Sequence, residues 1–282
     1  MPSQILVVGA TGKQGSKVLR SLLAAGHPAS SITCLTRNPN SPSAEKIKSE
    51  GANVVKGSLN DIASLRDALK GKDAAFLVTT IPEKGEPAED EQGRNFISAA
   101  SATALPYLVF ASVAGASHTC GVPHFETKAR IEDALKASGI RHAVLRPVAF
   151  FDNWAKEPGF GQAMALGLFD AGLKGKPVQM VACDDIGHFA ARALLESALY
   201  AGRTMELAGD ELTMEQARQA YARVSGKSVS KAWLPGFVLR ALPYDLRMMF
   251  YWFNSDGFTV DIPSLKAEHP ALLSFEDWLR KN

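Results

Sequence analysis

Cysteine is scarce in this sequence, since 282 residues contain only Cys34, Cys120 and Cys183. The three are widely spaced, form no C-x-x-C pair and have no histidine nearby at ligand spacing. Disulfide frameworks and thiolate zinc sites both need regularly spaced cysteines. We therefore expect no disulfide and no metal site, and a reduced, cytoplasmic setting fits this cysteine usage best.

Long hydrophobic runs and blocks of one charge are missing as well. The first apolar run, Ile5 to Val8, stops at a glycine and follows no basic leader, so we expect neither a signal peptide nor a membrane span there. Net charge is +2 and no Lys/Arg block occurs, which argues against nucleic acid or an anionic membrane as partner. The one marked charge cluster, residues 83–92, is acidic and predicts a solvated loop.

Short apolar runs alternate with helical patterns through the first half of the chain. Parallel strands need such crossover helices, so the alternation predicts an α/β fold, a Rossmann doubly wound parallel sheet. The predicted strands are residues 4–8, 32–37, 52–57, 74–80, 107–112 and 142–150.

The rhythm changes after about Phe151, which predicts two parts. Residues 1–155 would be the dinucleotide-binding domain, and residues 156–282 a smaller carboxy-terminal α+β lobe for a substrate or partner. We expect the helix at residues 185–200, capped by Asp185, to pack back on the first domain. Thr213 stands three residues before Gln216 and predicts a capping box.

A glycine-rich turn, GATGKQG, joins the first predicted strand to the first helix. Gly9, Gly12 and Gly15 have the spacing that a phosphate-binding turn needs for a tight bend, close backbone approach and helix packing. Free N–H groups at the helix start would face a pyrophosphate. A purely structural turn is the weaker alternative. The predicted contacts are Gly9, Ala10, Thr11, Gly12, Lys13, Gln14 and Gly15, of which Lys13 is as plausibly solvent-exposed.

The second strand ends in Leu35-Thr36-Arg37-Asn38 and carries no carboxylate. An NAD site usually has Asp or Glu there for the ribose hydroxyls, whereas an Arg guanidinium can pair with a 2′-phosphate. Arg37 therefore predicts NADP(H) as cofactor, the alternative being an ordinary solvated arginine. Ligands of open sheets bind at the carboxyl ends of the strands. That edge should also hold Ser58, Leu59, Thr79, Thr80, Ile81 and Ser112, although strand-end polarity alone would explain the two threonines.

Several motifs in order along nearly the whole chain resemble the NmrA-like family of atypical short-chain dehydrogenases/reductases. They are VVGATGKQG, LTRNP, HF-x-x-K, the run LRPVAFFDN, the DIG helix start and the terminal SFEDWL. The resemblance implies that Gly9 to Gln14 hold the pyrophosphate and that Lys128 reaches the nicotinamide ribose. It implies further contacts from Arg37 and Asn38 to the adenosine phosphate, from Thr79, Thr80 and Ile81 to the middle of the cofactor, and from Phe150, Phe151 and Asn153 to the nicotinamide.

The chain departs from the family pattern in two places. Ser41 stands where a second basic residue often follows the arginine, so the grip on a 2′-phosphate rests more heavily on Arg37. Ser58 stands where some relatives carry a carboxylate after the third strand, which leaves the adenine contact open.

The stretch HFETK keeps the four-residue spacing of the Tyr-x-x-x-Lys pair of ordinary short-chain reductases but replaces the tyrosine with His124. An imidazolium could protonate a substrate if a carboxylate or a cofactor phosphate offsets the charge of Lys128, and Glu126 points to another helix face. In the alternative, Lys128 anchors the ribose while His124 only packs at the helix start. Lys128 and His124 are the catalytic candidates.

Two functions follow from these residues. The first is an NADPH-dependent reductase that passes hydride to a small aromatic, quinone-like or imine acceptor, with Phe150, Phe151 and Trp154 walling the pocket or packing in the core. The second is a non-enzymatic NADP(H) redox sensor that regulates a protein partner, as some members of the resembled family do. The aromatic residues 244–253 could form a lid, a dimer face or core.

Overall fold

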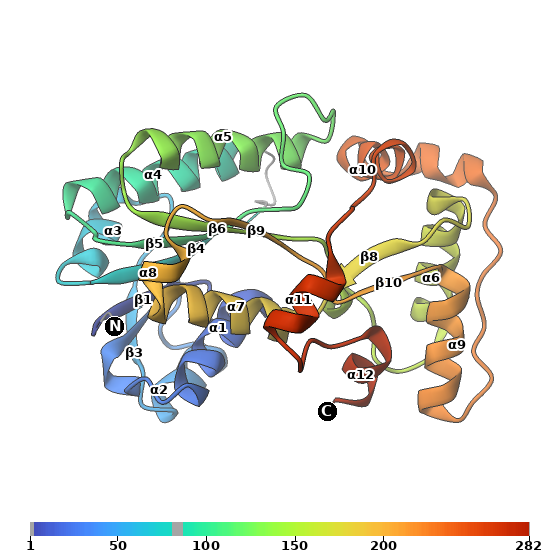
Figure 1. Cartoon of the computed structure of the whole chain (residues 1–282), viewed down its shortest axis with the longest axis horizontal. Helices are drawn as coiled ribbons and strands as arrows, with labels where there is room; N and C mark the ends of the chain where they lie inside the picture. Colours follow the sequence, from blue (N-terminus) through green and yellow to red (C-terminus); the bar gives the residue numbers. More distant parts are fainter. Residues whose placement is uncertain (1–2, 81–86, 282) are drawn as a thin grey trace.

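A seven-stranded parallel sheet forms the centre of the protein, in a computed structural model that describes residues 3–80 and 87–281 (Figure 1). The strand order is β3-β2-β1-β4-β5-β6-β9, and every neighbouring pair runs parallel. This order, which reverses direction at β1, confirms the predicted Rossmann α/β fold. The strands are β1 (Ile5–Val8), β2 (Ile32–Thr36), β3 (Asn53–Lys56), β4 (Ala74–Val78), β5 (Leu108–Ala111), β6 (His142–Pro147) and β9 (Thr204–Leu207).

Helices cover both faces of this sheet (Figure 1). On one face α3, α4 and α5 pack in sequence, and α1 and α7 pack against each other on the other face. Two apolar clusters, one per face, fill the space between helices and strands, which is why the buried strands carry near-continuous apolar runs. The helices of this part are α1 (Lys13–Ala24), η1 (Ala29–Ser31), α2 (Pro42–Ser49), α3 (Ile62–Leu69), α4 (Pro87–Ala102), α5 (Pro123–Ala137), α7 (Cys183–Leu195) and α8 (Ser197–Tyr200).

A second, three-stranded sheet lies at the carboxyl edge of the first, in the order β10-β8-β7. Helices α6, α9, α10 and α12 enclose a third apolar cluster against it. Since β9 and α7 belong to the large sheet layer, the segment after residue 156 contributes to both parts of the molecule. The remaining elements are β7 (Ala149–Phe150), η2 (Phe151–Asn153), α6 (Phe160–Leu173), β8 (Val178–Val181), β10 (Asp210–Leu212), α9 (Met214–Ser225), η3 (Gly236–Ala241), α10 (Tyr244–Ser255), α11 (Ile262–Glu268) and α12 (Phe275–Arg280).

Of the helix caps predicted at Thr213 and Asp185, one is confirmed and the other is wrong. The capping box of Thr213 and Gln216 at α9 is confirmed, with both reciprocal bonds present. Asp185 is wrong as an N-cap, because α7 begins two residues earlier and the carboxylate is buried, accepting the backbone N–H of Leu273 at 3.1 Å. Burial raises the pKa of Asp185 to about 7. This carboxylate ties α7 to the chain before α12.

The described residues contain neither a candidate membrane-spanning helix nor a cluster of metal-binding side chains. No helix within residues 3–80 and 87–281 combines the length and apolarity needed to cross a bilayer. The same residues contain no group of three or more His, Cys, Asp or Glu side chains arranged to hold a metal ion.

Helix α7 approaches α1 so closely that glycine is required at the crossing. A Cβ added to Gly187 would lie 2.6 Å from the carbonyl carbon of Lys17, a distance that backbone atoms cannot relieve by a rotamer change. We expect Gly187→Ala to lower the free energy of unfolding by about 2 kcal/mol, as overpacking in a dense core does. Urea unfolding followed by circular dichroism measures the change.

Gly161→Ala is the matched control, because Gly161 is also helical and a Cβ there meets nothing within 4 Å. We expect it to leave stability unchanged or to raise it slightly. Equal stability of the two variants would contradict the close contact of α1 with α7.

Candidate active site

The glycine turn brings backbone to backbone between β1 and α1. Gly9 has φ +73°, and a Cβ there would lie 2.6 Å from Cγ1 of Val78 on β4. A Cβ on Gly15 would lie 2.3 Å from the carbonyl oxygen of Gly9, so α1 rests directly on the turn. Gly12 caps α1 without a side-chain bond, which leaves the first N–H groups of the helix available to an anion. Oε1 of Gln14, in the first turn of α1, is buried and has no partner among the described residues.

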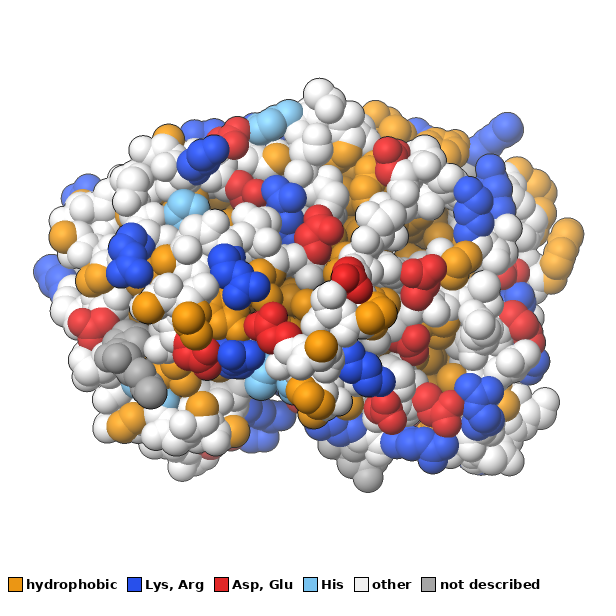
Figure 2. All heavy atoms as spheres, viewed as in Figure 1, with side chains coloured by type: hydrophobic (Ala, Val, Ile, Leu, Met, Phe, Trp, Pro, Cys, Tyr) orange, Lys and Arg blue, Asp and Glu red, His pale blue; other side chains and the backbone are white. Residues whose placement is uncertain are grey.

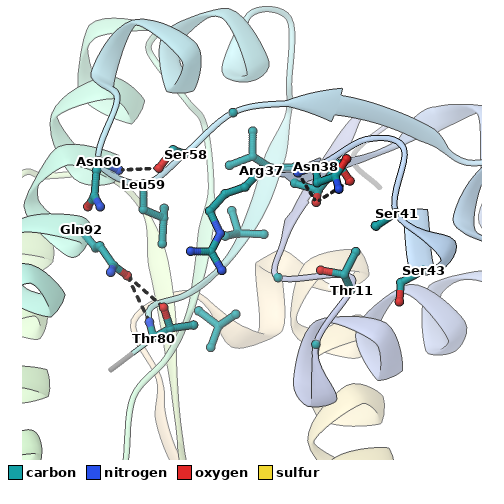
Figure 3. A pocket seen from close by; sticks show the side chains of 17 residues that line it. Thr11, Arg37, Asn38, Ser41, Ser43, Ser58, Leu59, Asn60, Thr80 and Gln92 are labelled. Atoms are coloured by element: carbon teal, nitrogen blue, oxygen red, sulfur yellow. Dashed lines mark hydrogen bonds between the residues drawn. The ribbon is translucent and has the colours of Figure 1, made fainter. Parts of the chain in front are cut away.

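A cavity of about 510 Å³ opens beside this turn at the carboxyl edge of the sheet (Figure 3). Arg37 extends into it from the end of β2, and within the described residues its guanidinium has no carboxylate partner within 4.0 Å. The cavity therefore offers a free cation opposite free helix N–H groups. Its wall includes Gly9, Thr11, Gly12, Arg37, Asn38, Ser41, Ser43, Ser58, Leu59, Asn60, Thr80 and Gln92.

Eight of the eighteen predicted cofactor residues line this one cavity, and two residues that the sequence analysis missed hold the loops around it. Gln92 on α4 accepts the backbone N–H of Thr80 at 3.1 Å. Asn95 on the same helix donates to the carbonyl oxygen of Leu59 at 3.1 Å. Helix α4 therefore holds the loops that follow β3 and β4. Ile81, also predicted at this edge, lies outside the described residues.

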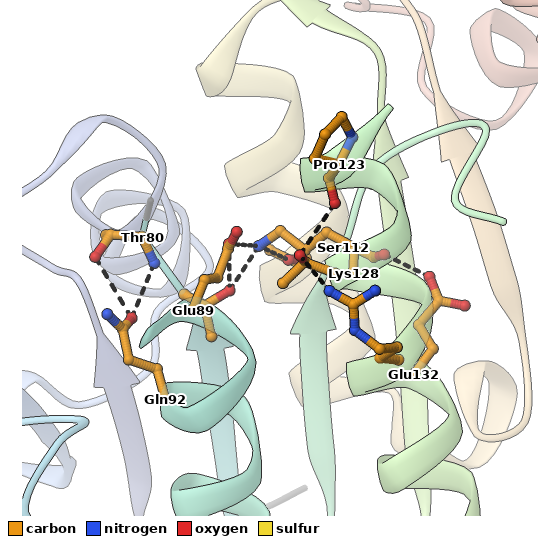
Figure 4. Close-up of polar contacts among 11 residues, drawn as sticks. Thr80, Glu89, Gln92, Ser112, Pro123, Lys128 and Glu132 are labelled. Carbon is orange, nitrogen blue, oxygen red and sulfur yellow. Dashed lines mark hydrogen bonds and ion pairs between the residues drawn. The ribbon is translucent and has the colours of Figure 1, made fainter. Parts of the chain in front are cut away.

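The acidic segment at residues 83–92 is not simply a solvated loop. Helix α4 begins at Pro87, and Glu89 and Gln92 are both buried. Glu89 forms an ion pair with Lys128 of α5, its Oε1 lying 2.9 Å from Nζ (Figure 4). Their side chains retain 3% and 11% of their exposure, so neither charge is solvated by bulk water. A buried charge needs such a partner.

Thr79 joins this pair at the end of β4. Nζ of Lys128 lies 2.6 Å from Oγ1 of Thr79, and that hydroxyl lies 2.9 Å from Oε1 of Glu89. The three groups form a closed triangle at the carboxyl edge of the sheet (Figure 4). Lys128 is therefore held beside the strand ends, and its contact with a nicotinamide ribose stays a prediction.

Ser112 takes part in a different network. Its hydroxyl donates to Glu132 of α5, which in turn holds Arg146 of β6 through two bonds of 3.0 and 2.6 Å. Hydrogen bonding to Glu132 raises the pKa of Arg146. This network fixes α5 on the sheet beneath the Lys128 triangle, so the Ser112 hydroxyl is already engaged.

The run from Phe150 to Asn153 spans the junction between the two sheets. Asn153 accepts Nζ of Lys13 at 2.9 Å, and the same ammonium binds the carbonyl oxygen of Asp152 at 2.8 Å, so Lys13 links the glycine turn to this loop. Phe151 is fully buried, with its ring centroid 5.2 Å from that of Phe275. Phe150 is half-buried against the core of the large sheet. Of the pair Phe150 and Phe151, Phe151 packs in the lobe core.

His124 has the carboxylate partner that the sequence analysis required but did not find. Nδ1 of its ring lies 2.8 Å from Oδ1 and 2.7 Å from Oδ2 of Asp245, at the start of α10. Burial pushes the pKa of Asp245 upward, but the hydrogen bonds and charge of His124 outweigh burial and hold it below its usual value. Glu126 accepts the backbone N–H of Gly121 instead, as its different helix face predicted.

The buried pair of Lys128 and Glu89 gives a stability prediction. Glu89→Gln leaves the Lys128 ammonium buried without a counter-charge, and we expect a loss of about 3 kcal/mol in the free energy of unfolding. Asp67→Asn is the matched control, since Asp67 pairs with Lys70 on the surface and both side chains are 73% exposed. Its effect should stay within about 0.5 kcal/mol. Urea unfolding compares the two, and similar losses would contradict a buried pair.

Known proteins similar to this chain include reductases and oxidoreductases. The chain is 32% identical over 228 residues to a (4-alkanoyl-5-oxo-2,5-dihydrofuran-3-yl)methyl phosphate reductase of Streptomyces griseus, covering 79% of the chain and 74% of that protein. It is 30% identical over 159 residues to the NmrA-like family domain-containing oxidoreductase himF of Aspergillus japonicus. That match covers 53% of the chain and only 47% of himF, so the chain spans about half of that relative.

Among solved structures, the NADPH-dependent quinone oxidoreductase QOR2 of Escherichia coli, complexed with NADPH, superposes with a TM-score of 0.78. It is 25% identical, and the match covers 98% of each chain. The sequence model of the NmrA-like family matches residues 1–279, nearly the whole chain. This protein therefore belongs to the NmrA-like family.

Proposed function

We propose that this protein binds NADP(H) in the cavity beside the glycine turn and reduces a small aromatic, quinone-like or imine acceptor. The observation that carries the proposal is the guanidinium of Arg37, which has no carboxylate partner among the described residues and faces that cavity, together with the uncapped start of α1. Both groups attract phosphate, and the missing Cβ atoms of the turn let a pyrophosphate approach the backbone. The cofactor supplies hydride when bound.

The 2′-phosphate would lie between Arg37 and the start of α2. Ser41 and Ser43 line the same wall of the cavity, and Ser41 caps α2 by accepting the backbone N–H of Ala44 at 3.2 Å. Two hydroxyls and the positive end of α2 would then support the arginine. These groups would compensate for the missing second basic residue, whose place Ser41 takes.

Lys128 would hold a ribose hydroxyl of the nicotinamide half. Glu89 and Thr79 already fix its ammonium beside the strand ends, so little side-chain entropy remains to be lost on binding. An ammonium has three protons to donate, and two of them reach Glu89 and Thr79. The third points to the carbonyl oxygen of Ala111 at a long 3.4 Å, a weak bond that a ribose hydroxyl would replace.

The names of relatives support reduction as the chemistry. Quinone oxidoreductase QOR2 and the Streptomyces reductase use the same fold or sequence pattern, and hydride transfer to a quinone or iminium needs no tyrosine. Reduction is tested by following NADPH oxidation through its absorbance with a panel of quinones, enones, imines and aromatic ethers. We expect turnover with at least one class.

Flat traces across the panel, together with saturable NADPH binding, would favour the sensor function instead. In that case calorimetry should find a protein partner whose affinity differs between NADP⁺, NADPH and no ligand, because only differential binding can shift a two-state equilibrium. Equal affinities would eliminate the sensor as well.

The cofactor preference gives a separate prediction. Arg37→Glu should weaken NADPH binding roughly 10- to 100-fold, the value of a charge-assisted bond, and leave NADH binding nearly unchanged. Fluorescence titration with both dinucleotides measures the two affinities.

Arg141→Glu is the matched control, because it changes the net charge equally but lies before β6, at the opposite edge of the sheet. It should alter neither affinity. An unchanged NADPH affinity in Arg37→Glu would contradict the assignment of the 2′-phosphate to Arg37.

A further inference from the structure

The first turn of α5 is completed by a residue from the carboxy-terminal lobe. Val122, at the N-cap of α5, makes no side-chain cap bond, and Pro123 follows at the first helical position. Asp245 of α10 accepts the backbone N–H of His124 at 3.1 Å. A carboxylate at a helix start satisfies a free N–H and interacts favourably with the positive end of the helix. Asp245 therefore caps α5 across the boundary between the two parts of the molecule.

The same carboxylate holds the imidazole ring of His124. Both carboxylate oxygens lie within hydrogen-bond distance of Nδ1, at 2.8 and 2.7 Å. A carboxylate accepts only, so Nδ1 carries the proton in this bond. The contact of the ring with Phe125, edge to face at 4.6 Å between centroids, restrains it further. One orientation and one protonated nitrogen are thus selected.

The second ring nitrogen is available for chemistry. Nε2 of His124 has no hydrogen-bond partner among the residues that the structure describes, and the side chain is 18% exposed. Lys128 follows one turn later on α5, and its ammonium lies beside Thr79 at the end of β4. Residues four apart lie on one face of a helix, so His124 projects on the side that faces the strand ends.

Three charged residues lie near His124 in space or along α5. Asp245 is its nearest charged neighbour, whereas the ammonium of Lys128 is neutralised by Glu89. The carboxylate of Glu126 is bound to the backbone of Gly121. A carboxylate in contact with an imidazole stabilises its charged form, and Asp245 is the carboxylate in contact here.

We propose that Asp245 is a positioning residue that holds His124 as a charged proton donor for the reduced acceptor. This inference rests on the proposed reductase function. In the step, the acceptor gains two electrons and one hydrogen as hydride from the bound nicotinamide dinucleotide. It gains one proton from Nε2 of the His124 imidazolium, the N–H bond breaking as the O–H or N–H bond of the product forms. The neutral imidazole then recovers a proton from solvent.

The two residues of this pair come from different parts of the chain. His124 belongs to the dinucleotide domain and Asp245 to the lobe, 121 residues later. Proton donation therefore requires α10 to be seated on α5. An acceptor bound between them is reduced only where the lobe is in place.

Asp245→Asn tests the pair, because the amide keeps an acceptor oxygen for α5 but removes the charge. The first measurement is the titration of the His124 ring protons by NMR without any ligand, assigned with His124→Gln. In Asp245→Asn we expect His124 to lose its ring proton at a lower pH than in the unaltered protein, with its proton-binding constant reduced roughly tenfold. Glu126→Gln is the control and should leave this titration unchanged. An unmoved titration in Asp245→Asn would overturn the pair, whatever the activity.

The second measurement is the pH dependence of kcat with an acceptor that needs a proton as it takes hydride, such as an enone. At about pH 8 the asparagine variant should be roughly tenfold slower than the unaltered protein, and near pH 5.5 the two should converge, because both imidazoles are then charged. NADPH affinity, measured by fluorescence titration, should be equal. Parallel pH profiles of the two proteins would overturn the proton-donor role.

The two hypotheses fail in different ways. If no variant and no unaltered protein binds NADPH, the proposed function is wrong and the proton-donor role falls with it. Normal NADPH binding with an unmoved His124 titration eliminates only the pair. Should Asp245→Asn fail to fold, His124→Gln removes the proton donor from the other side of the pair, and a pH profile of kcat equal to that of the unaltered protein would then overturn the proton-donor role.

Discussion

The approach of α1 to the glycine turn is the constraint on which the site depends. Because Gly15 lies against the carbonyl oxygen of Gly9, the start of α1 points at the carboxyl edge of the sheet. A side chain at Gly15 would push the helix away from the turn, and one at Gly9 would meet Val78 on β4, beside the cavity that the turn shares with Arg37. The crossing of α7 over α1 at Gly187 then fixes the helix from behind. Three positions without side chains thus determine where every other group of the site can lie.

Local sequence patterns predicted the fold and part of the cavity wall, because these features depend on residues that are close together in the sequence. Apolar runs, the spacing of the glycines and the Thr213 capping box each depend on residues within one turn or one strand. Once the strands are parallel, their ends must converge at one edge, so Arg37 and Thr80 come together without any knowledge of contacts.

The groups that complete the site could not be found in this way, because each comes from a distant element. Glu89 stands in an acidic run whose composition predicts solvent exposure, and only its pairing with Lys128 makes burial tolerable. Asp245 stands among aromatic residues 121 positions away from His124. A capping prediction also failed where tertiary contact decided, since Asp185 serves Leu273 rather than its own helix. Charge pairs between residues far apart in the sequence produce no periodic pattern that a single sequence could reveal.

The two pairs on α5 differ in what they can do. The ammonium of Lys128 is nearly buried among three acceptors, Thr79, Glu89 and Ala111, which suits a group that only has to hold a ligand in place. The imidazole of His124 is more exposed, at 18% against 11%. Among the described residues it is bound at Nδ1 alone, which suits a group that must exchange protons with solvent. Histidine stands at the tyrosine position of ordinary short-chain reductases, and an imidazole, unlike a phenol, can be held by a carboxylate at one nitrogen while the other serves a ligand. The lobe provides that carboxylate, Asp245, so the pair forms only where α10 meets the start of α5.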